Sequence, residues 1–289
     1  MEKRLTTGLI RLDEALGGGL LPGSLTLLIG ATGVGKTQLG MHFLQGGSEQ
    51  EQRLGAVIDL SSRGDSQNHD GYSQRIAGLS LTTQVIDRDA LACPFMSGPP
   101  AAVFPFLGYG GKRVLRSQMD VDEWHLLQAE LNRRLPQLFR FVYRHLIHGG
   151  RRFVIDGIEP SEHTGDSIQL DLVELIDRRM LKQDHDWLAR EVLREKFYDS
   201  QVAVEEHAYP AGHSAAVALV TTKHALLDQL MTAPLADGDL AAGANTVILL
   251  GRVMREGEMS RALYIAKHRG SYADSRVIPF TIENRGICF

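Results

Sequence analysis

Cysteine is scarce in this chain, and no long apolar run occurs in its 289 residues. The two cysteines, Cys93 and Cys288, lie far apart without metal-ligand spacing, which argues against a disulfide scaffold or a cysteine-rich metal module. No stretch approaches the roughly 20 apolar residues that span a bilayer, and no apolar run of a signal peptide follows residues 1–5. We therefore expect a cytoplasmic protein with no contact to a membrane.

An excess of positive charge is also missing. The chain has 31 Lys and Arg residues against 35 Asp and Glu residues, for a formal net charge of -4. This balance argues against nucleic acid as the main partner, although it does not exclude a local basic groove. Apolar residues make up 43% and charged residues 23%, which is ordinary for a globular chain.

Short apolar runs alternate with helical patterns through most of the chain. The pattern predicts buried strands at 25–29, 56–60, 153–156 and 216–221, and helices at 38–45, 74–81, 122–148 and 171–197. Pro136 should break or kink the third of these helices. The segment 93–111, rich in proline and glycine, should be an irregular loop.

The C-terminal part changes character. Segments 246–254 and 261–267 predict a hairpin, and a further strand is expected at 277–282. The expected fold class is α/β: one domain over residues 1–289, with a largely parallel central sheet flanked by helices and a C-terminal antiparallel hairpin or meander.

One motif carries specific chemistry. The pattern G-x-x-x-x-G-K-[ST] is satisfied by the run Gly30, Ala31, Thr32, Gly33, Val34, Gly35, Lys36 and Thr37. Backbone N–H groups of such a loop turn inward around phosphates, and the positive end of the following helix adds to the field. Lys36 should reach the β- and γ-phosphates, and the Thr37 hydroxyl should bind Mg²⁺. A strand before the motif and a helix after it give the context that this interpretation requires, so the motif predicts Mg·ATP binding.

Asp156 is the candidate for the second magnesium ligand. It ends the apolar run Phe153-Val154-Ile155, and P-loop proteins hold Mg²⁺ with a carboxylate at a strand end. The alternative is that Asp156 only caps a turn beside Gly157.

Several segments together resemble KaiC-like ATPases of the RecA superfamily. They are Thr7-Gly8-Leu9-Ile10-Arg11-Leu12-Asp13 with Gly18-Gly19-Leu20, then 244–250, the K-x-R-G segment 265–271, and 279–282 with Gly286-Ile287. The resemblance implies a RecA-like P-loop domain that forms rings, commonly hexamers, with nucleotide between neighbouring subunits. It also implies that Lys267 and Arg269 act in trans on the neighbour's phosphates. Two inserted blocks, at about 90–145 and 165–210, are longer than in typical members, and we expect them to bind a protein partner.

The sequence departs from this family where the second strand ends. Members carry glutamates there that orient the attacking water, whereas this chain has Ser61 and Ser62. Loss of a positioned base typically costs about 10²–10⁴-fold in rate. Asp59, Asp65, His69 and Glu159 are the candidates for a substitute base, with Asp59 and Glu159 the first choices. Hydrolysis should therefore be slow or absent.

These observations leave several functions open. The first is a slow Mg-dependent ATPase acting as a ring-forming signalling or regulatory protein. The second is an ATP-stabilised scaffold with little or no hydrolysis, which Ser61 and Ser62 favour. A DNA recombination ATPase on the same fold is a further alternative, opposed by the acidic charge balance. A protein kinase would share the ATP site, but no residue suggests itself as the acceptor.

Overall fold

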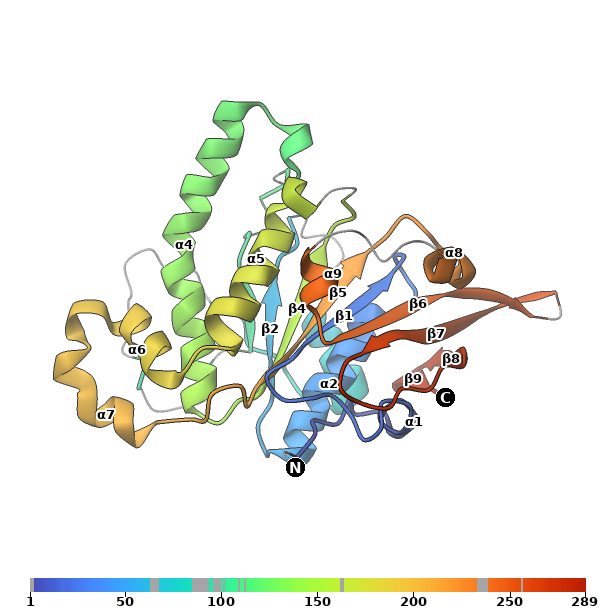
Figure 1. Cartoon of the computed structure of the whole chain (residues 1–289), viewed down its shortest axis with the longest axis horizontal. Helices are drawn as coiled ribbons and strands as arrows, with labels where there is room; N and C mark the ends of the chain where they lie inside the picture. The colour runs from blue at the N-terminus through green and yellow to red at the C-terminus, as the bar shows by residue number, and fades with distance from the viewer. Residues whose placement is uncertain are drawn as a thin grey trace.

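One mixed β-sheet forms the centre of the computed structural model (Figure 1). Over the described residues it has nine strands in the order β3-β2-β4-β5-β1-β6-β7-β8-β9. The strands are β1 (Leu25–Gly30), β2 (Ala56–Asp59), β3 (Val103–Pro105), β4 (Arg152–Ile158), β5 (Ala215–Thr221), β6 (Thr246–Arg255), β7 (Glu258–His268), β8 (Ile278–Glu283) and β9 (Gly286–Cys288). The structure describes residues 3–62, 68–84, 94–95, 100, 102–108, 110–111, 113–161, 164–232, 239–255 and 257–289.

The sheet is parallel at one end and antiparallel at the other. Strand β1 lies between β5 and β6 and is parallel to both, and β2 is parallel to β3 and β4. From β6 onward each strand is antiparallel to the next, through β7, β8 and β9. The expected α/β fold class, with a largely parallel sheet and a C-terminal antiparallel meander, is confirmed.

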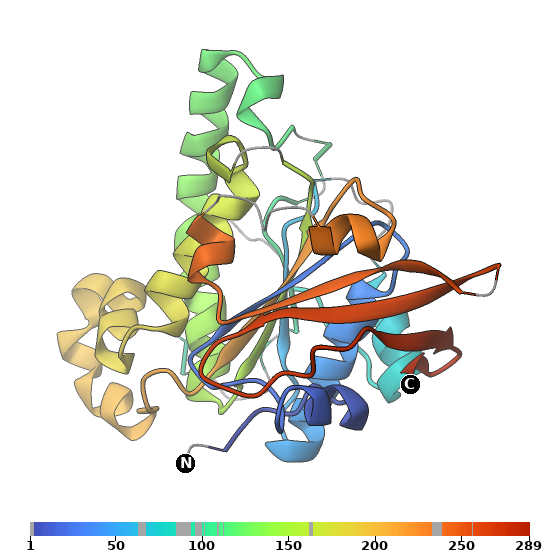
Figure 2. The same ribbon diagram turned by 45° about the vertical axis from the view of Figure 1, so that its right-hand side comes forward.

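Helices cover both faces of this sheet (Figures 1 and 2). Their bounds are α1 (Ile10–Ala15), α2 (Lys36–Gln50), α3 (His69–Ala77), α4 (Val121–Ile147), α5 (Ile168–Ile176), α6 (His185–Leu193), α7 (Gln201–Glu206), α8 (Leu227–Thr232) and α9 (Asp239–Gly243). Among the described residues, no helix combines the length and apolar character needed to cross a membrane.

Side chains alternate between the two faces of the sheet along each strand, and this produces two apolar cores. In β1, Leu25 and Leu27 belong to a core that includes α4, α5 and α6, whereas Leu28 belongs to a second core with α1, α2, β8 and β9. Side chains of a strand point to opposite faces in turn, so these apolar strands are buried on both sides. The sheet is therefore the middle of three layers.

Helix α4 continues through Pro136, so of the expected break or kink, the break is wrong. The helix runs for 27 residues and begins at a capping box between Asp120 and Glu123. Proline removes one backbone hydrogen bond and costs about 3 kcal/mol inside a helix. Leu131 and Leu138, on either side of Pro136, are both buried in the same core. Packing against the sheet offsets the local penalty and keeps the helix in one piece.

The long helix expected at 171–197 is replaced by shorter pieces. Helix α5 ends at Ile176, a π-helical turn covers Asp177–Leu181, and α6 begins at His185. The Asp184 side chain accepts a hydrogen bond from the Trp187 N–H at 2.8 Å and starts α6 as a separate helix. The helical periodicity was therefore right, but the cap inside it was missed.

Two further boundaries differ from expectation. The segment 93–111 contains the short strand β3, which pairs with β2 at the sheet edge, where a proline such as Pro105 is tolerated. Helix α3 begins at His69 rather than near 74, because the Asn68 side chain accepts a hydrogen bond from the Gly71 N–H at 2.8 Å.

The segments 90–145 and 165–210, which the resemblance predicts to be insertions, pack against each other. Helix α4 belongs mostly to the first segment, and α5 to α7 belong to the second. The rings of Phe139 and Trp187 lie 6.3 Å apart, and those of Tyr143 and His185 lie 6.0 Å apart. Both segments contribute to the core on one face of the sheet. Their helices therefore form one layer on that face.

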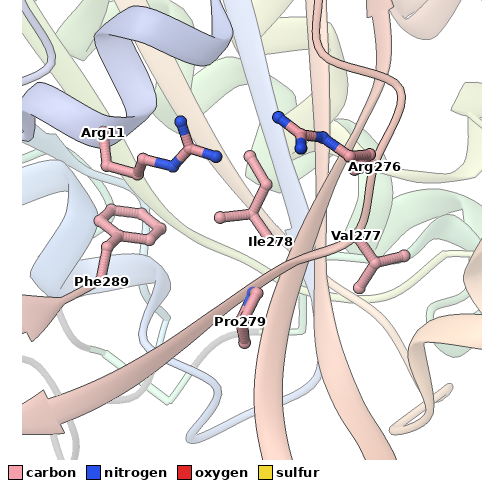
Figure 3. Close-up of a pocket in the computed structure, with 6 residues that line it drawn as sticks. All are labelled: Arg11, Arg276, Val277, Ile278, Pro279 and Phe289. Carbon is pink, nitrogen blue, oxygen red and sulfur yellow. The ribbon is translucent and has the colours of Figure 1, made fainter.

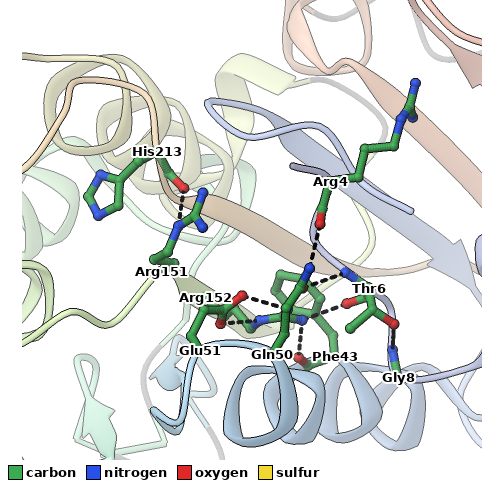
Figure 4. Close-up of polar contacts among 9 residues, drawn as sticks. All are labelled: Arg4, Thr6, Gly8, Phe43, Gln50, Glu51, Arg151, Arg152 and His213. Atoms are coloured by element: carbon green, nitrogen blue, oxygen red, sulfur yellow. Dashed lines mark hydrogen bonds and ion pairs between the residues drawn. The ribbon is translucent and has the colours of Figure 1, made fainter. Parts of the chain in front are cut away.

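A buried arginine joins the start of the chain to the sheet (Figure 4). Arg152, at the start of β4, is 1% exposed. Its guanidinium donates to both oxygens of Glu51 at 2.8 and 2.9 Å, and to Gln50 Oε1 at 2.6 Å. It also donates to the backbone carbonyls of Thr6 and Phe43, and it lies over the Phe43 ring. Arg152 therefore connects β4, the end of α2 and the N-terminal segment.

The C-terminal hairpin β8–β9 packs on the beginning of α2. A methyl group added at Gly35 would lie 3.1 Å from Ile282 Cδ1 and 3.6 Å from a ring carbon of Phe280. Further along α2, His42 Nε2 accepts a hydrogen bond from the Ile287 N–H at 3.0 Å. This bond requires an unprotonated Nε2, so the buried His42 ring is neutral in the folded chain.

This contact predicts acid sensitivity. Burial lowers the pKa of His42 to about 4, whereas an unfolded histidine has a pKa near 6.5. Below the unfolded pKa, the unfolded chain takes up the proton and the folded chain does not, so stability falls as pH falls through this window. We expect the free energy of unfolding to fall by about 1–2 kcal/mol, through this one group, between about pH 7.5 and about pH 5. Urea unfolding at both pH values would measure it, and His42→Gln should show a shallower loss than the parent chain. Equal losses of stability in the parent chain and in His42→Gln would contradict the assignment of the acid sensitivity to His42.

Candidate functional site

The phosphate loop joins the end of β1 to the start of α2. Gly33 and Gly35 adopt positive φ angles of 78° and 111°, which favour glycine. A side chain at Gly30 would meet the Leu250 carbonyl oxygen at 2.4 Å, so β6 requires glycine there. Thr32 and Gly33 are exposed at the crest of the loop. The loop therefore presents its backbone to solvent at the N-terminus of a 15-residue helix.

Lys36 is held inside this loop. It is 8% exposed, and its ammonium group donates to the carbonyl oxygens of Gly30 at 2.8 Å and Ala31 at 3.0 Å. Burial lowers its pKa to about 8, although the negative charge of Asp156 opposes this shift. A buried cation whose hydrogen bonds go to neutral carbonyls would gain strongly from a phosphate.

Thr37 and Asp156 meet beside the loop. The Thr37 hydroxyl donates to Asp156 Oδ2 at 3.1 Å, which joins the first turn of α2 to the end of β4. Hard oxygen ligands of this kind suit Mg²⁺, which binds one or two protein groups and otherwise keeps water and phosphate oxygens. The donor set therefore fits the expected metal, with Thr37 and Asp156 as the residues that would hold it.

His69 bridges the two strand-end aspartates. Its Nε2 lies 3.1 Å from Asp156 Oδ2, and its Nδ1 lies 3.7 Å from Asp59 Oδ2. All three side chains are at most 5% exposed. Burial lowers the pKa of His69, but the hydrogen bond to Asp156 and the charges of Asp156 and Asp59 outweigh it and raise the pKa overall. His69 thus orients the carboxylate that Thr37 also contacts, as outer groups do around metal ligands.

Serines 61 and 62 have separate partners. Ser61 donates from its N–H, at 2.8 Å, and from its hydroxyl to Asp59 Oδ1. The Ser62 hydroxyl donates to Glu159 Oε1 at 2.9 Å. Of the suggested substitute bases, Asp59 is fully buried and Glu159 is half-buried, while Asp65 lies outside the described residues.

Gln169 is a site residue that the sequence did not suggest. This buried side chain of α5 donates to the carbonyls of Leu60 at 2.7 Å and Gly157 at 2.8 Å, and it accepts from the Glu159 N–H at 2.8 Å. It therefore ties the ends of β2 and β4 to the inserted blocks. The available signal was a polar residue between Ile168 and Leu170 in the first turn of α5, although such residues are often exposed.

Lys267 and Arg269 lie far from their own phosphate loop. Lys267, on β7, pairs with Val247 at the start of β6, and β6 runs parallel to β1. The loop follows the opposite end of β1, several strand residues and roughly 10–15 Å away. Lys267 instead donates to the carbonyls of Ala241 and Ala242 at 2.7 and 3.0 Å, whereas Arg269 is exposed. The structure does not bring these two residues to the site of the same chain.

A hollow is lined mainly by residues near the C-terminal end of the sequence (Figure 3). It has a volume of about 490 Å³ and is lined by Arg11, Arg276, Val277, Ile278, Pro279 and Phe289. Arg276 pairs with both oxygens of Asp274, at 3.0 Å and 2.8 Å, and Arg11 lies 4.0 Å from the same carboxylate. Its arginines are therefore engaged, and the hollow contains none of the phosphate-loop residues.

Comparison with known proteins agrees with this geometry. A family model described as "ATPase: KaiC" matches residues 5–68. The circadian clock oscillator protein KaiC of Synechococcus elongatus is 24% identical over 284 residues, covering 98% of this chain and 41% of the relative. The circadian clock oscillator protein KaiC 1 of Synechocystis sp. is 23% identical, with the same coverage. The chain thus spans about two fifths of the length of these curated relatives. With the phosphate loop and the strand order, these similarities support the expected resemblance to KaiC-like P-loop ATPases of the RecA superfamily.

Proposed function

We propose that this chain binds Mg·ATP and hydrolyses it slowly, as part of a ring-forming regulatory protein. The observation that carries the proposal is the cluster at the start of α2. There, the buried Lys36 ammonium donates to two loop carbonyls, and the Thr37 hydroxyl lies 3.1 Å from Asp156. Bound Mg²⁺ would neutralise developing charge on the phosphates. Lys36 and the backbone N–H groups of the loop would hold the triphosphate in place.

Ring formation is part of the same proposal. Lys267 and Arg269 lie at the sheet edge opposite their own loop, which is compatible with action on a neighbouring subunit. Relatives that carry the name KaiC are described as circadian clock oscillator proteins, which supports a regulatory role. We further propose a homo-oligomer of hexameric type.

The inserted blocks offer a surface for a protein partner. Tyr198, just before α7, and Val202, in α7, are each 72% exposed. Exposed apolar side chains that gather in a patch are common at interaction sites. The partner would bind the added layer rather than the nucleotide site.

A scaffold with little turnover is the second candidate. Ser61 and Ser62 favour it, because neither hydroxyl can accept a proton at neutral pH as a carboxylate can. In a scaffold, ATP would hold neighbouring subunits together without being consumed.

Steady-state turnover and equilibrium binding of Mg·ATP decide between these functions. The purified chain would be assayed with Mg²⁺ and with EDTA, and the Lys36→Ala variant would serve as control. Turnover that needs both Mg²⁺ and Lys36 would establish the ATPase. Binding without turnover would favour the scaffold. Binding that is absent, or equal in the Lys36→Ala variant, would contradict both functions.

A further inference from the structure

Hydrolysis requires a group that orients the attacking water, and the strand ends limit the choice. P-loop proteins use a side chain near the γ-phosphate for this purpose. In the described residues, three carboxylates lie at or just beyond the ends of β2 and β4: Asp59, Asp156 and Glu159. Asp156 is engaged by Thr37 and His69. Asp59 is fully buried, with Oδ1 held by Ser61. Only Glu159 of these three is open to solvent to an appreciable degree.

The register of the sheet brings Glu159 to the end of the neighbouring strand. Asp59 of β2 and Asp156 of β4 are direct partners in parallel strands, and the Leu60 N–H donates to the Asp156 carbonyl at 2.8 Å. Ser62 and Glu159 each follow their aspartate by three residues, and their side chains meet at 2.9 Å. The Glu159 carboxylate, just after β4, therefore reaches the Ser62 hydroxyl in the segment that follows β2.

Gln169 fixes the backbone that carries this carboxylate. Its amide oxygen accepts the Glu159 N–H, and its amide nitrogen donates to carbonyls at the ends of both strands, Leu60 and Gly157. Gly157 has a φ of 89°, and a methyl group there would lie 2.4 Å from the Ser61 nitrogen. The two strand ends are thus in close contact, and one buried side chain joins them.

We infer that Glu159 is the catalytic carboxylate of this site, held by Ser62 and positioned by Gln169. The inference rests on the proposed function. The water oxygen forms a bond to the γ-phosphorus while the bond from phosphorus to the β,γ-bridging oxygen breaks. The bonding electron pair leaves with ADP, and the water proton passes to the Glu159 carboxylate. The carboxylate lost at residues 61 and 62 is supplied by the adjacent strand.

Glu159→Gln tests this role with the least change in shape. The amide oxygen can still accept from Ser62, but the side chain no longer accepts a proton. We expect kcat to fall about 10²–10⁴-fold. The Kd for Mg·ATP should stay within about threefold, because neither Lys36 nor Thr37 is altered. The unchanged Kd also shows that the variant folds. Glu195→Gln, on an exposed turn, is the matched control and should leave both values unchanged.

Two further variants test the positioning. Ser62→Ala removes one hydrogen bond to the carboxylate and should lower kcat about 2- to 10-fold with little change in KM. The exchange variant Ser62→Glu with Glu159→Ser returns a carboxylate to β2. The kcat of this double variant should be at least about tenfold higher than that of Glu159→Ser alone. A purely structural role for Glu159 would not produce that recovery.

The outcomes separate this inference from the proposed function. If the parent chain turns over and Glu159→Gln does so within about threefold of it, Glu159 is not the catalytic carboxylate and the ATPase remains. If the parent chain binds Mg·ATP without turnover, the inference is wrong and nucleotide binding remains. If binding itself is absent, the proposed function fails.

Discussion

Lys36→Ala should weaken Mg·ATP binding by about 10- to 150-fold, since hydrogen bonds to charged groups contribute about 1.5–3 kcal/mol. In the free chain the ammonium group is buried, and among the described residues it donates to the Gly30 and Ala31 carbonyls. Burial already lowers its pKa to about 8, so it is a poorly solvated cation that a triphosphate would stabilise. Alanine removes this interaction and leaves the loop backbone in place. Titration with a fluorescent ATP analogue, with and without Mg²⁺, would measure the change.

The control for this variant is Lys196→Ala. Lys196 is exposed on a short turn between α6 and α7, and the substitution removes the same charge from the chain. Its Kd should match that of the parent chain. If both variants weaken binding equally, the effect comes from net charge rather than from the phosphate loop.

Arg152→Leu should destabilise the chain by about 3–5 kcal/mol, because it leaves the buried Glu51 carboxylate without its partner. The same change removes donors to Gln50 and to the carbonyls of Thr6 and Phe43. In a domain of about 150–250 residues, 1 kcal/mol shifts Tm by about 2–4 °C, so Tm should fall by roughly 6–20 °C. Urea unfolding followed by circular dichroism would measure the loss.

The adjacent residue gives a matched comparison, which Figure 4 also shows. Arg151 is half-buried, and the contact drawn for it is a hydrogen bond to the His213 carbonyl at 2.8 Å. Arg151→Leu should cost about 1 kcal/mol or less. Glu51→Gln in the Arg152→Leu background should recover part of the loss, because it removes the unpaired buried charge. Similar losses at positions 151 and 152 would contradict the role assigned to Arg152.

The sequence predicted those features that depend on neighbouring residues. The strand, glycine-rich loop and helix around Lys36 follow from local pattern, as do β4, β5 and the hairpin of β6 and β7. Predictions were wrong where distant packing or a cap decides the outcome. Helix α4 continues through Pro136 because Leu131 and Leu138 are both buried, and Asp184 starts a new helix inside a periodic segment.

The site residues also separate into those that local sequence predicts and those that depend on distant contacts. Lys36, Thr37 and Asp156 belong to motifs, whereas the contacts of His69 and Gln169 join residues about 90–110 positions apart. No local pattern encodes such contacts. The action of Lys267 and Arg269 on a neighbouring subunit remains a prediction, since it depends on a second copy of the chain.

The packing of β8–β9 on Gly35 has a consequence for synthesis. The phosphate loop lies near the start of the chain, but Phe280, Ile282 and Ile287 support it from the other end of the sequence. During translation, β1 and α2 leave the ribosome long before these partners exist. The loop therefore cannot reach its final packing until residue 287 has emerged. A nascent chain that has not reached this point should hold ATP weakly.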